Sequence, residues 1–339
     1  MKNINLSVDG GGTSLRVIAF DDDLKLVAQS KSGSVNPNFE SAEKIGNNMT
    51  EAVKMLLANL DGNFKIKNIY ATIVGSVSLF HEILVKESDT LSESATVCNI
   101  SEGHSHLFAA SLGDKGGIAL AGTGSGAIYC NKGEIIHLGG YGIPVGDEGS
   151  GASIGIQGIS AVVKDINGWG EKTLLTEKLY KYLNLSTIRS SFIGELYRKG
   201  VNQRNLFAGF CRYVAECERE GDKTARDIMY SAGRDMGLQM VSVIKRAEDK
   251  NMIDTASESP VVYASGGAWK GTPYMLETMA ETVHNAYPDA ICTHGLFDPV
   301  MGGVIKFIFD KTGRYAISEQ HKEHLKKEFR EYLFEFDKF

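Results

Sequence analysis

Apolar and polar residues repeat one local pattern at two places in the chain. Near the N-terminus, apolar runs at 5–8 and 15–20 flank an Asp-Gly-Gly-Gly-Thr turn at 9–13, the first glycine turn. The same order recurs over 118–130 around Gly-Thr-Gly-Ser at 122–125, the second glycine turn. Each glycine turn has an apolar run on both sides, some alternating and some continuous. This pattern predicts a strand, a tight turn and a second strand.

The remaining pattern alternates between strand-like and helix-like periods. In the first part of the chain it predicts strands over 24–28, 69–74 and 96–100, and helices over 41–59, 81–87 and 104–112. In the later part it predicts strands over 134–138 and 260–264, and helices over 153–166, 171–183, 186–198, 203–219, 222–248 and 273–286. Strands and helices that alternate in this way indicate an α/β architecture.

The length of 339 residues exceeds one typical core, which predicts two domains, over 1–113 and 114–317. The tail over 318–339 carries an apolar stripe at helical spacing, formed by Leu325, Phe329, Tyr332, Leu333 and Phe336. A helix with such a stripe must pack against another surface. We expect it to cross back to the first domain, because it follows the last glycine pair of the second domain, at 302–303.

Charge and cysteine content argue against several classes of protein. The chain has 36 Lys and Arg against 42 Asp and Glu, a net charge of −6, and no long basic block, which argues against nucleic acid as a partner. Five cysteines form no C-x-x-C pair, so neither a zinc site nor a disulfide framework is expected. No apolar run reaches membrane-spanning length and no signal peptide is evident. We therefore expect a cytoplasmic protein with no membrane partner.

The two glycine turns suit the binding of an anion. Glycine leaves backbone N–H groups open to close approach, and a threonine hydroxyl adds a donor, so such a turn can hold a phosphate. A strand follows each turn, whereas a P-loop or a dinucleotide fingerprint would place a helix there. Two such turns at the start of two successive segments favour the polyphosphate of a nucleotide over two ordinary β-turns.

Several segments together resemble a known family. They are Val-Asp-Gly-Gly-Gly-Thr at 8–13, Ala-Gly-Thr-Gly-Ser at 121–125, Gly-Gly-Tyr-Gly at 139–142, Gly-Asp-Glu-Gly-Ser at 146–150, Phe-Ala-Gly-Phe-Cys-Arg at 207–212 and Ser-Gly-Gly-Ala-Trp-Lys at 265–270. The chain resembles the N-acetylglucosamine kinase group of the BadF/BadG/BcrA/BcrD ATPase family, within the acetate and sugar kinase, Hsp70 and actin superfamily. The resemblance implies two ribonuclease H-like domains with an interdomain cleft, the first on the sugar and phosphate side and the second, with a helical insertion, on the nucleotide side.

The resemblance also implies the ligands and the residues that bind them. ATP and Mg²⁺ are the expected cofactors, with Asp9 beside the metal, directly or through water. Nucleotide contacts are expected from Gly10, Gly11, Gly12, Thr13, Gly122, Thr123, Gly124, Ser125, Ala208, Ser265, Gly266 and Gly267. Sugar contacts are expected from Asn36, Gly140, Tyr141, Gly142 and Asp147. Asn36 also fits an ordinary turn before proline, and Asp147 could instead cap the following helix.

The catalytic base is where the sequence departs from this group, whose members usually place an aspartate before the second glycine turn. Here the nearest carboxylate is Glu102, which could accept the proton of the attacking hydroxyl. The spacing is uncertain by one residue, so Gly103 could occupy the position instead. His104 would then be a substitute base, or simply a residue at a helix start.

Three classes of function fit these motifs and the resemblance. The first is an ATP-dependent kinase that makes the 6-phosphate of N-acetylglucosamine, or that acts on glucosamine or N-acetylmuramic acid. The second is a sugar or nucleotide sensor without catalysis. The third is an activating ATPase of a 2-hydroxyacyl-CoA dehydratase, whose iron–sulfur cluster the cysteine spacing does not match. We expect the kinase, with an amino sugar and ATP as ligands, while the preferred sugar and a homodimeric state stay open.

Overall fold

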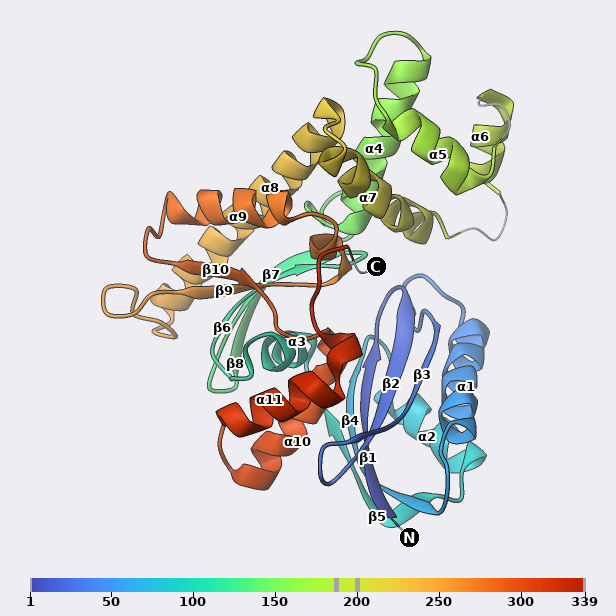
Figure 1. Cartoon of the computed structure of the whole chain (residues 1–339), viewed down its shortest axis with the longest axis vertical. Coiled ribbons are helices and arrows are strands. Elements are labelled where there is room, and N and C mark those ends of the chain that lie inside the picture. Colours follow the sequence, from blue (N-terminus) through green and yellow to red (C-terminus); the bar gives the residue numbers. More distant parts are fainter. Residues whose placement is uncertain (1, 186–188, 199–201, 338–339) are drawn as a thin grey trace. The chain divides into compact units, whose positions relative to one another are not determined.

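The computed structural model describes residues 2–185, 189–198 and 202–337, and the chain forms two compact units. Unit 1 contains the chain up to Lys115 together with Gly295–Leu333. Unit 2 contains Gly116–His294 and the segment from Phe334 onward. Each unit is built around one five-stranded sheet (Figure 1).

The sheet of unit 1 has the strand order β3-β2-β1-β4-β5. Its strands are β1 (Lys2–Gly10), β2 (Ser14–Asp21), β3 (Leu26–Gly33), β4 (Phe64–Ile73) and β5 (Leu91–Asn99). The first three pair antiparallel, and β4 and β5 join parallel to β1. The first glycine turn connects β1 to β2, so the predicted hairpin is confirmed.

Two apolar clusters hold helices on the sheet of unit 1. One joins the sheet to α1 (Ala42–Ala58) and α2 (Val77–Glu87) through side chains such as Leu6, Met49 and Phe80. The other joins it to α3 (Glu102–Ser111), α10 (Gly302–Thr312) and α11 (Glu319–Glu328) through side chains such as Phe20 and Phe307. Figure 1 shows α1 on one side of these strands and α10 and α11 on the other.

Unit 2 repeats the same sheet topology, in the order β10-β9-β6-β7-β8. Its strands are β6 (Gly116–Ala121), β7 (Ser125–Asn131), β8 (Glu134–Gly139), β9 (Val261–Ser265) and β10 (Ile291–His294). The second glycine turn joins the antiparallel pair β6 and β7, which confirms the second hairpin. Strand β9 runs parallel to β6, and β10 parallel to β9.

Helices make up most of the rest of unit 2. They are α4 (Gly151–Ile166), α5 (Leu175–Leu183), α6 (Arg189–Leu196), α7 (Gln203–Arg219), α8 (Lys223–Asp249) and α9 (Pro273–His284). The long α8 packs on β6, β7 and β8 and also contacts α7 and α9. The predicted helix over 186–198 begins outside the described residues. No helix within the described ranges is both long and apolar enough to cross a bilayer.

The C-terminal part of the chain differs from the sequence expectation. The glycine pair at 302–303 does not form a turn but begins α10, and this segment lies in unit 1 rather than in the second domain. The reason is close packing, because a Cβ atom at Gly302 would overlap Ser105 and one at Gly303 would overlap Ser7. Strand β10 was also missed, because only four residues pair there.

The predicted helix over the tail is shorter than its apolar stripe. Helix α11 ends at Glu328, and a single 3-10 turn, η3 (Arg330–Tyr332), follows. Leu333 has an extended backbone and forms a β-bridge with Phe297. The residues Leu325, Phe329 and Tyr332 are buried in unit 1, whereas the segment from Phe334 belongs to unit 2.

Helices α4 and α7 approach each other closely enough to require glycine. A Cβ atom at Gly155 would overlap the backbone carbonyl of Phe207, which cannot move as a flexible side chain can. We expect Gly155→Ala to lower the free energy of unfolding by about 2–3 kcal/mol through overpacking. Gly46→Ala on α1 is the matched control, because a Cβ there meets nothing within 4 Å. It should stabilise the protein by about 0.5–1 kcal/mol.

Urea denaturation of the two variants checks this prediction. The expected result is a lower midpoint for Gly155→Ala and a higher one for Gly46→Ala. If both alanines shift stability by the same amount, helix propensity rather than the contact between α4 and α7 controls the effect.

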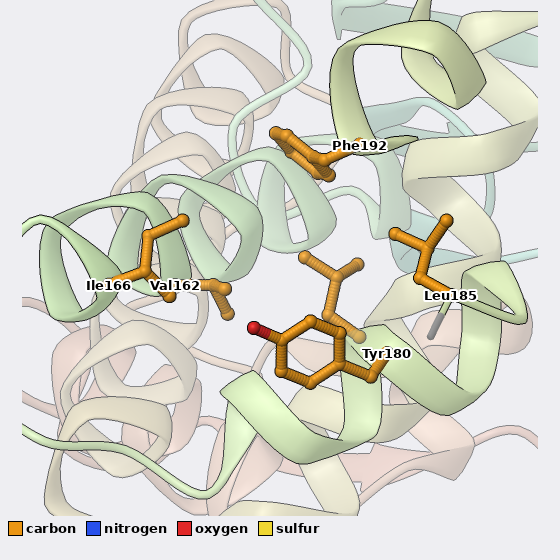
Figure 2. A pocket seen from close by; sticks show the side chains of 6 residues that line it. Val162, Ile166, Tyr180, Leu185 and Phe192 are labelled. Carbon is orange, nitrogen blue, oxygen red and sulfur yellow. The ribbon is translucent and has the colours of Figure 1, made fainter. Parts of the chain in front are cut away.

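A small apolar pocket lies among the helices of unit 2. It is lined by Val162, Ile166, Leu179, Tyr180, Leu185 and Phe192. Figure 2 shows these side chains converging from the helices around the pocket. Its cavity of about 10 Å³ holds no more than a single water molecule, so it is a packing defect and not a substrate site.

Candidate functional site

The first glycine turn is held in place by backbone hydrogen bonds. The Gly11 N–H donates to the Ser14 carbonyl (3.1 Å) and the Gly11 carbonyl accepts from the Val35 N–H (3.2 Å). The Gly10 carbonyl accepts from the Val74 N–H (2.8 Å). Thr13 at the tip of the turn is exposed. The turn thus has a fixed backbone and an exposed threonine at its tip, which suits the binding of a phosphate.

Asp9, at the end of β1, lies in an acidic environment. Partial burial raises the pKa of its carboxyl to about 7; the positive charge of Arg16 opposes this shift, and the charges of Glu102 and Asp298 add to it. Arg16 itself forms an ion pair with Asp298 (3.0 Å between Nη1 and Oδ2). Sequence reasoning missed Asp298, because it lies 282 residues from Arg16 along the chain.

The donor set around Asp9 is suited to a divalent cation. Carboxylate oxygens are the ligands that Mg²⁺ prefers, and a cation would relieve the repulsion that raises the pKa of Asp9. Within the described residues, no three acidic, histidine or cysteine side chains are grouped closely enough to chelate a metal ion. Phosphate oxygens or water would have to supply the remaining ligands.

Glu102 is the first residue of α3 and lies close enough to Asp9 to affect its pKa. Ser101 caps this helix, and its hydroxyl accepts the His104 N–H (3.4 Å) and contacts His104 Nδ1 (2.7 Å). Burial lowers the pKa of His104, against the charge of Asp114. Gly103, the other position allowed by the spacing, is buried and has no side chain that could accept a proton.

Asn36 lies beside the first glycine turn and is buried. Its side-chain oxygen accepts the Asn38 N–H (2.9 Å), and its own N–H donates to the Ser34 hydroxyl (3.4 Å). The side-chain oxygen of Asn36 therefore forms a local turn contact, as the turn interpretation predicts. A contact between Asn36 and a sugar stays a prediction.

The second glycine turn is fixed by the start of α4. The Gly151 N–H donates to the Gly122 carbonyl (2.8 Å), and the Ala152 N–H donates to the Thr123 carbonyl (3.4 Å). The Ser125 hydroxyl donates to the Glu148 carbonyl (2.7 Å). The turn is thereby tied to the segment that leads into α4.

Gly266, another predicted nucleotide contact, packs against the second glycine turn. Gly266 has a φ of +112°, and a Cβ atom there would be 2.5 Å from the Ala121 carbonyl oxygen. The Ala208 carbonyl oxygen would lie 3.5 Å from a Cβ atom placed on Gly151, the first residue of α4. Ser265 is buried at the end of β9, and Gly267 follows as an exposed residue. The structure therefore places Gly266 against the second glycine turn and Ala208 against the start of α4.

The loop over 139–149 brings together the predicted sugar contacts of unit 2. Gly140 and Gly142 have φ values of +77° and +80°, and Tyr141 between them is 81% exposed. The Asp147 side chain is buried, and its Oδ1 accepts the Gly142 N–H (3.2 Å). Ser150, not Asp147, caps α4 with its side chain, so the capping alternative for Asp147 is wrong.

Asp147 has a charged partner that sequence reasoning missed. Arg204 Nη2 lies 2.6 Å from Asp147 Oδ2, and both side chains are largely buried. No signal in the sequence singles out this arginine, because it lies 57 residues from Asp147 along the chain.

All five cysteines are free thiols; Cys98 and Cys292 are half-buried and the other three are buried. Burial raises the pKa of Cys130 and Cys211 to about 12 and that of Cys292 to about 11. Burial disfavours the charged form of these thiols, which suits structural rather than reactive cysteines.

Two curated proteins resemble the chain over nearly its whole length. An N-acetylmuramic acid/N-acetylglucosamine kinase of Clostridium acetobutylicum is 24% identical over 305 residues, which cover 88% of this chain and 96% of the relative. An N-acetyl-D-glucosamine kinase of Dictyostelium discoideum is 25% identical over 316 residues, which cover 90% and 97%.

A solved structure has the same fold. It is a ROK family glucokinase of Streptomyces griseus in complex with glucose and AMPPNP, with a TM-score of 0.54 and 14% identity, covering 89% of this chain and 97% of that one. The expected sugar-kinase type of fold, with its two repeated α/β units, is thus confirmed. A family model matches residues 6–305. The chain belongs to the BadF/BadG/BcrA/BcrD ATPase family.

Proposed function

We propose that the protein transfers the γ-phosphoryl group of ATP to the 6-hydroxyl of an amino sugar, with N-acetylglucosamine as the preferred substrate. The observation that carries the proposal is the duplicated hairpin, which gives each unit one rigid glycine turn with backbone and hydroxyl donors. The relatives named as N-acetylglucosamine kinases support the choice of acceptor.

In this proposal the two glycine turns bind the phosphates. Thr13 and Thr123 donate hydroxyl hydrogen bonds to them, and Asp9 holds the metal, directly or through water. When bound there, Mg²⁺ would neutralise negative charge on the phosphate oxygens. Gly266, Gly267 and Ala208 leave room for the adenosine. Such an arrangement binds and orients the nucleotide without covalent chemistry.

Glu102 is the base in the proposed mechanism. Its carboxylate accepts the proton of the sugar hydroxyl as that oxygen forms its bond to phosphorus and the bond from phosphorus to the ADP oxygen breaks. Its place at the start of α3 favours the ionised form, because the partial positive charge of a helix N-terminus stabilises an anion. Asn36, Gly140, Tyr141, Gly142 and Asp147 bind the sugar in this proposal.

N-acetylmuramic acid is a second candidate substrate, because one relative is named for both sugars. A sensor without turnover is disfavoured by the carboxylate at Glu102 beside Asp9. An activating ATPase with an iron–sulfur cluster is disfavoured by the cysteine spacing, which does not match such a cluster.

A phosphorylation screen tests the proposal. The purified protein is incubated with ATP, Mg²⁺ and either N-acetylglucosamine, glucosamine, N-acetylmannosamine or N-acetylmuramic acid, and ADP release and sugar phosphate are measured. We expect N-acetylglucosamine to give the highest kcat/KM and a product phosphorylated at the 6-position. Sugar binding without ADP release would support the sensor, and release of ADP without any sugar phosphate would exclude the kinase.

A further inference from the structure

Arg204 brings a positive charge to the backbone of the second glycine turn. It is the second residue of α7, whose N-terminus Asn202 caps through its side chain. A Cβ atom placed on Gly124 would overlap Arg204 Nη2, and it would lie 2.8 Å from Asp147 Oδ2. The guanidinium and its carboxylate partner therefore lie in direct contact with the turn.

A contribution to stability does not by itself account for the ion pair of Arg204 and Asp147. The Asp147 side chain is 1% exposed and that of Arg204 14%, so both charges lose most of their hydration. Asp147 also adopts a left-handed backbone with φ of +64°, which is unfavourable for a residue with a Cβ atom. Buried charge and a strained backbone at the same residue are typical of functional sites.

The opposite charges of Arg204 and Asp147 determine whether a phosphate can bind at the second glycine turn. A carboxylate so close to Gly124 would repel any phosphate held by the second glycine turn. The guanidinium of Arg204 cancels that charge, and its planar set of donors can contact a carboxylate and a phosphate at once. The hydrogen bond from Gly142 to Asp147 further fixes the carboxylate that orients the arginine.

We propose that Arg204 binds the terminal phosphates of the nucleotide at the second glycine turn, with Asp147 holding the guanidinium in position. This inference rests on the proposed use of ATP. It adds the start of α7 to the phosphate site and gives Asp147 a role on the nucleotide side as well as its proposed contact with the sugar.

Nucleotide binding by two Arg204 variants tests the inference. The probes are the nonhydrolysable analogue AMPPNP with Mg²⁺, and AMP, which lacks the terminal phosphates; affinities are measured by calorimetry. Arg204→Met should weaken AMPPNP binding about 10- to 100-fold and leave AMP binding unchanged. Arg204→Lys, which keeps the charge but loses the planar fork, should weaken AMPPNP binding about 3- to 10-fold.

Arg234→Met is the matched control, because Arg234 lies on α8 in an exposed ion pair with Asp235. It should bind both probes as the unchanged protein does. If Arg204→Met weakens AMP and AMPPNP equally, the arginine only supports the fold, and the inference is overturned. If that variant does not fold, Arg204→Lys decides, since unchanged AMPPNP binding overturns the inference.

The binding experiment and the sugar screen can fail separately. Loss of AMPPNP affinity in Arg204→Met supports the phosphate contact even if none of the tested sugars is phosphorylated. Failure of the unchanged protein to bind AMPPNP overturns both this inference and the proposed kinase.

Discussion

Asp9→Asn should reduce phosphoryl transfer at least 100- to 1000-fold and, in metal-free buffer at pH 8, make the protein more stable. The loss of activity follows from removing the carboxylate proposed to hold the metal at the phosphates. The gain in stability follows from the raised pKa of Asp9, about 7 in the folded protein against 3.8 as the ordinary value. The folded state therefore resists ionising this group, and the amide has no charge to bury.

The gain in stability of Asp9→Asn depends on pH. A carboxyl whose pKa is raised by folding favours the folded state below pH 3.8 and loses that contribution as the pH rises through 7. The advantage of Asp9→Asn is therefore largest at pH 8 and fades towards pH 4. We expect about 1–2 kcal/mol at pH 8, well below the full shift, because Asp9 keeps partial contact with water.

Urea denaturation with EDTA at pH 8 and pH 5, together with an ADP-release assay, checks both parts. Asp23→Asn is the matched control, because Asp23 is an exposed acid in the same unit. It should change neither activity nor the pH dependence of stability. An Asp9→Asn protein with ordinary turnover would show that Asp9 is not part of the phosphate site.

Glu102→Gln should lower kcat about 100- to 10,000-fold and leave the KM for ATP within about twofold. The amide keeps the size of the side chain but cannot accept the proton of the attacking hydroxyl. Glu102→Asp should retain more activity than Glu102→Gln, because it keeps a carboxylate although the oxygen is displaced. Steady-state kinetics with N-acetylglucosamine and ATP measure these values.

His104→Gln separates the two candidate bases. Its ring contacts the Ser101 hydroxyl, and burial disfavours its protonated form. If Glu102 is the base, His104→Gln should keep kcat within about tenfold of the unchanged protein. Near-normal turnover in Glu102→Gln with a large loss in His104→Gln would assign the base to His104.

Local sequence pattern predicted much of each unit. Both hairpins, helices α1, α2 and α3 and the long α8 follow from apolar spacing within single elements. Helix α1 occupies Ala42–Ala58 with Ser41 as its cap, close to the predicted 41–59. These features depend on contacts between neighbouring residues, which the sequence displays directly.

Features that depend on packing were missed. The pair at 302–303 looks like a turn in sequence, and only the closeness of Ser105 and Ser7 explains why glycine begins a helix there. The tail has a helical stripe, but the chain leaves the helix at Glu328 so that Leu333 can pair with Phe297. In both cases the tertiary contact overrides the local pattern.

The sequence by itself determined the two glycine turns, the strands around them and Asp9 at the end of the first strand, because backbone turns are specified by adjacent residues. The tertiary structure alone decided the charges around these turns. Arg204 reaches Asp147 across 57 residues, and Arg16 reaches Asp298 across 282. Ion pairs of this kind arise from the way helices pack on the sheets, and no local periodicity records which distant side chains meet.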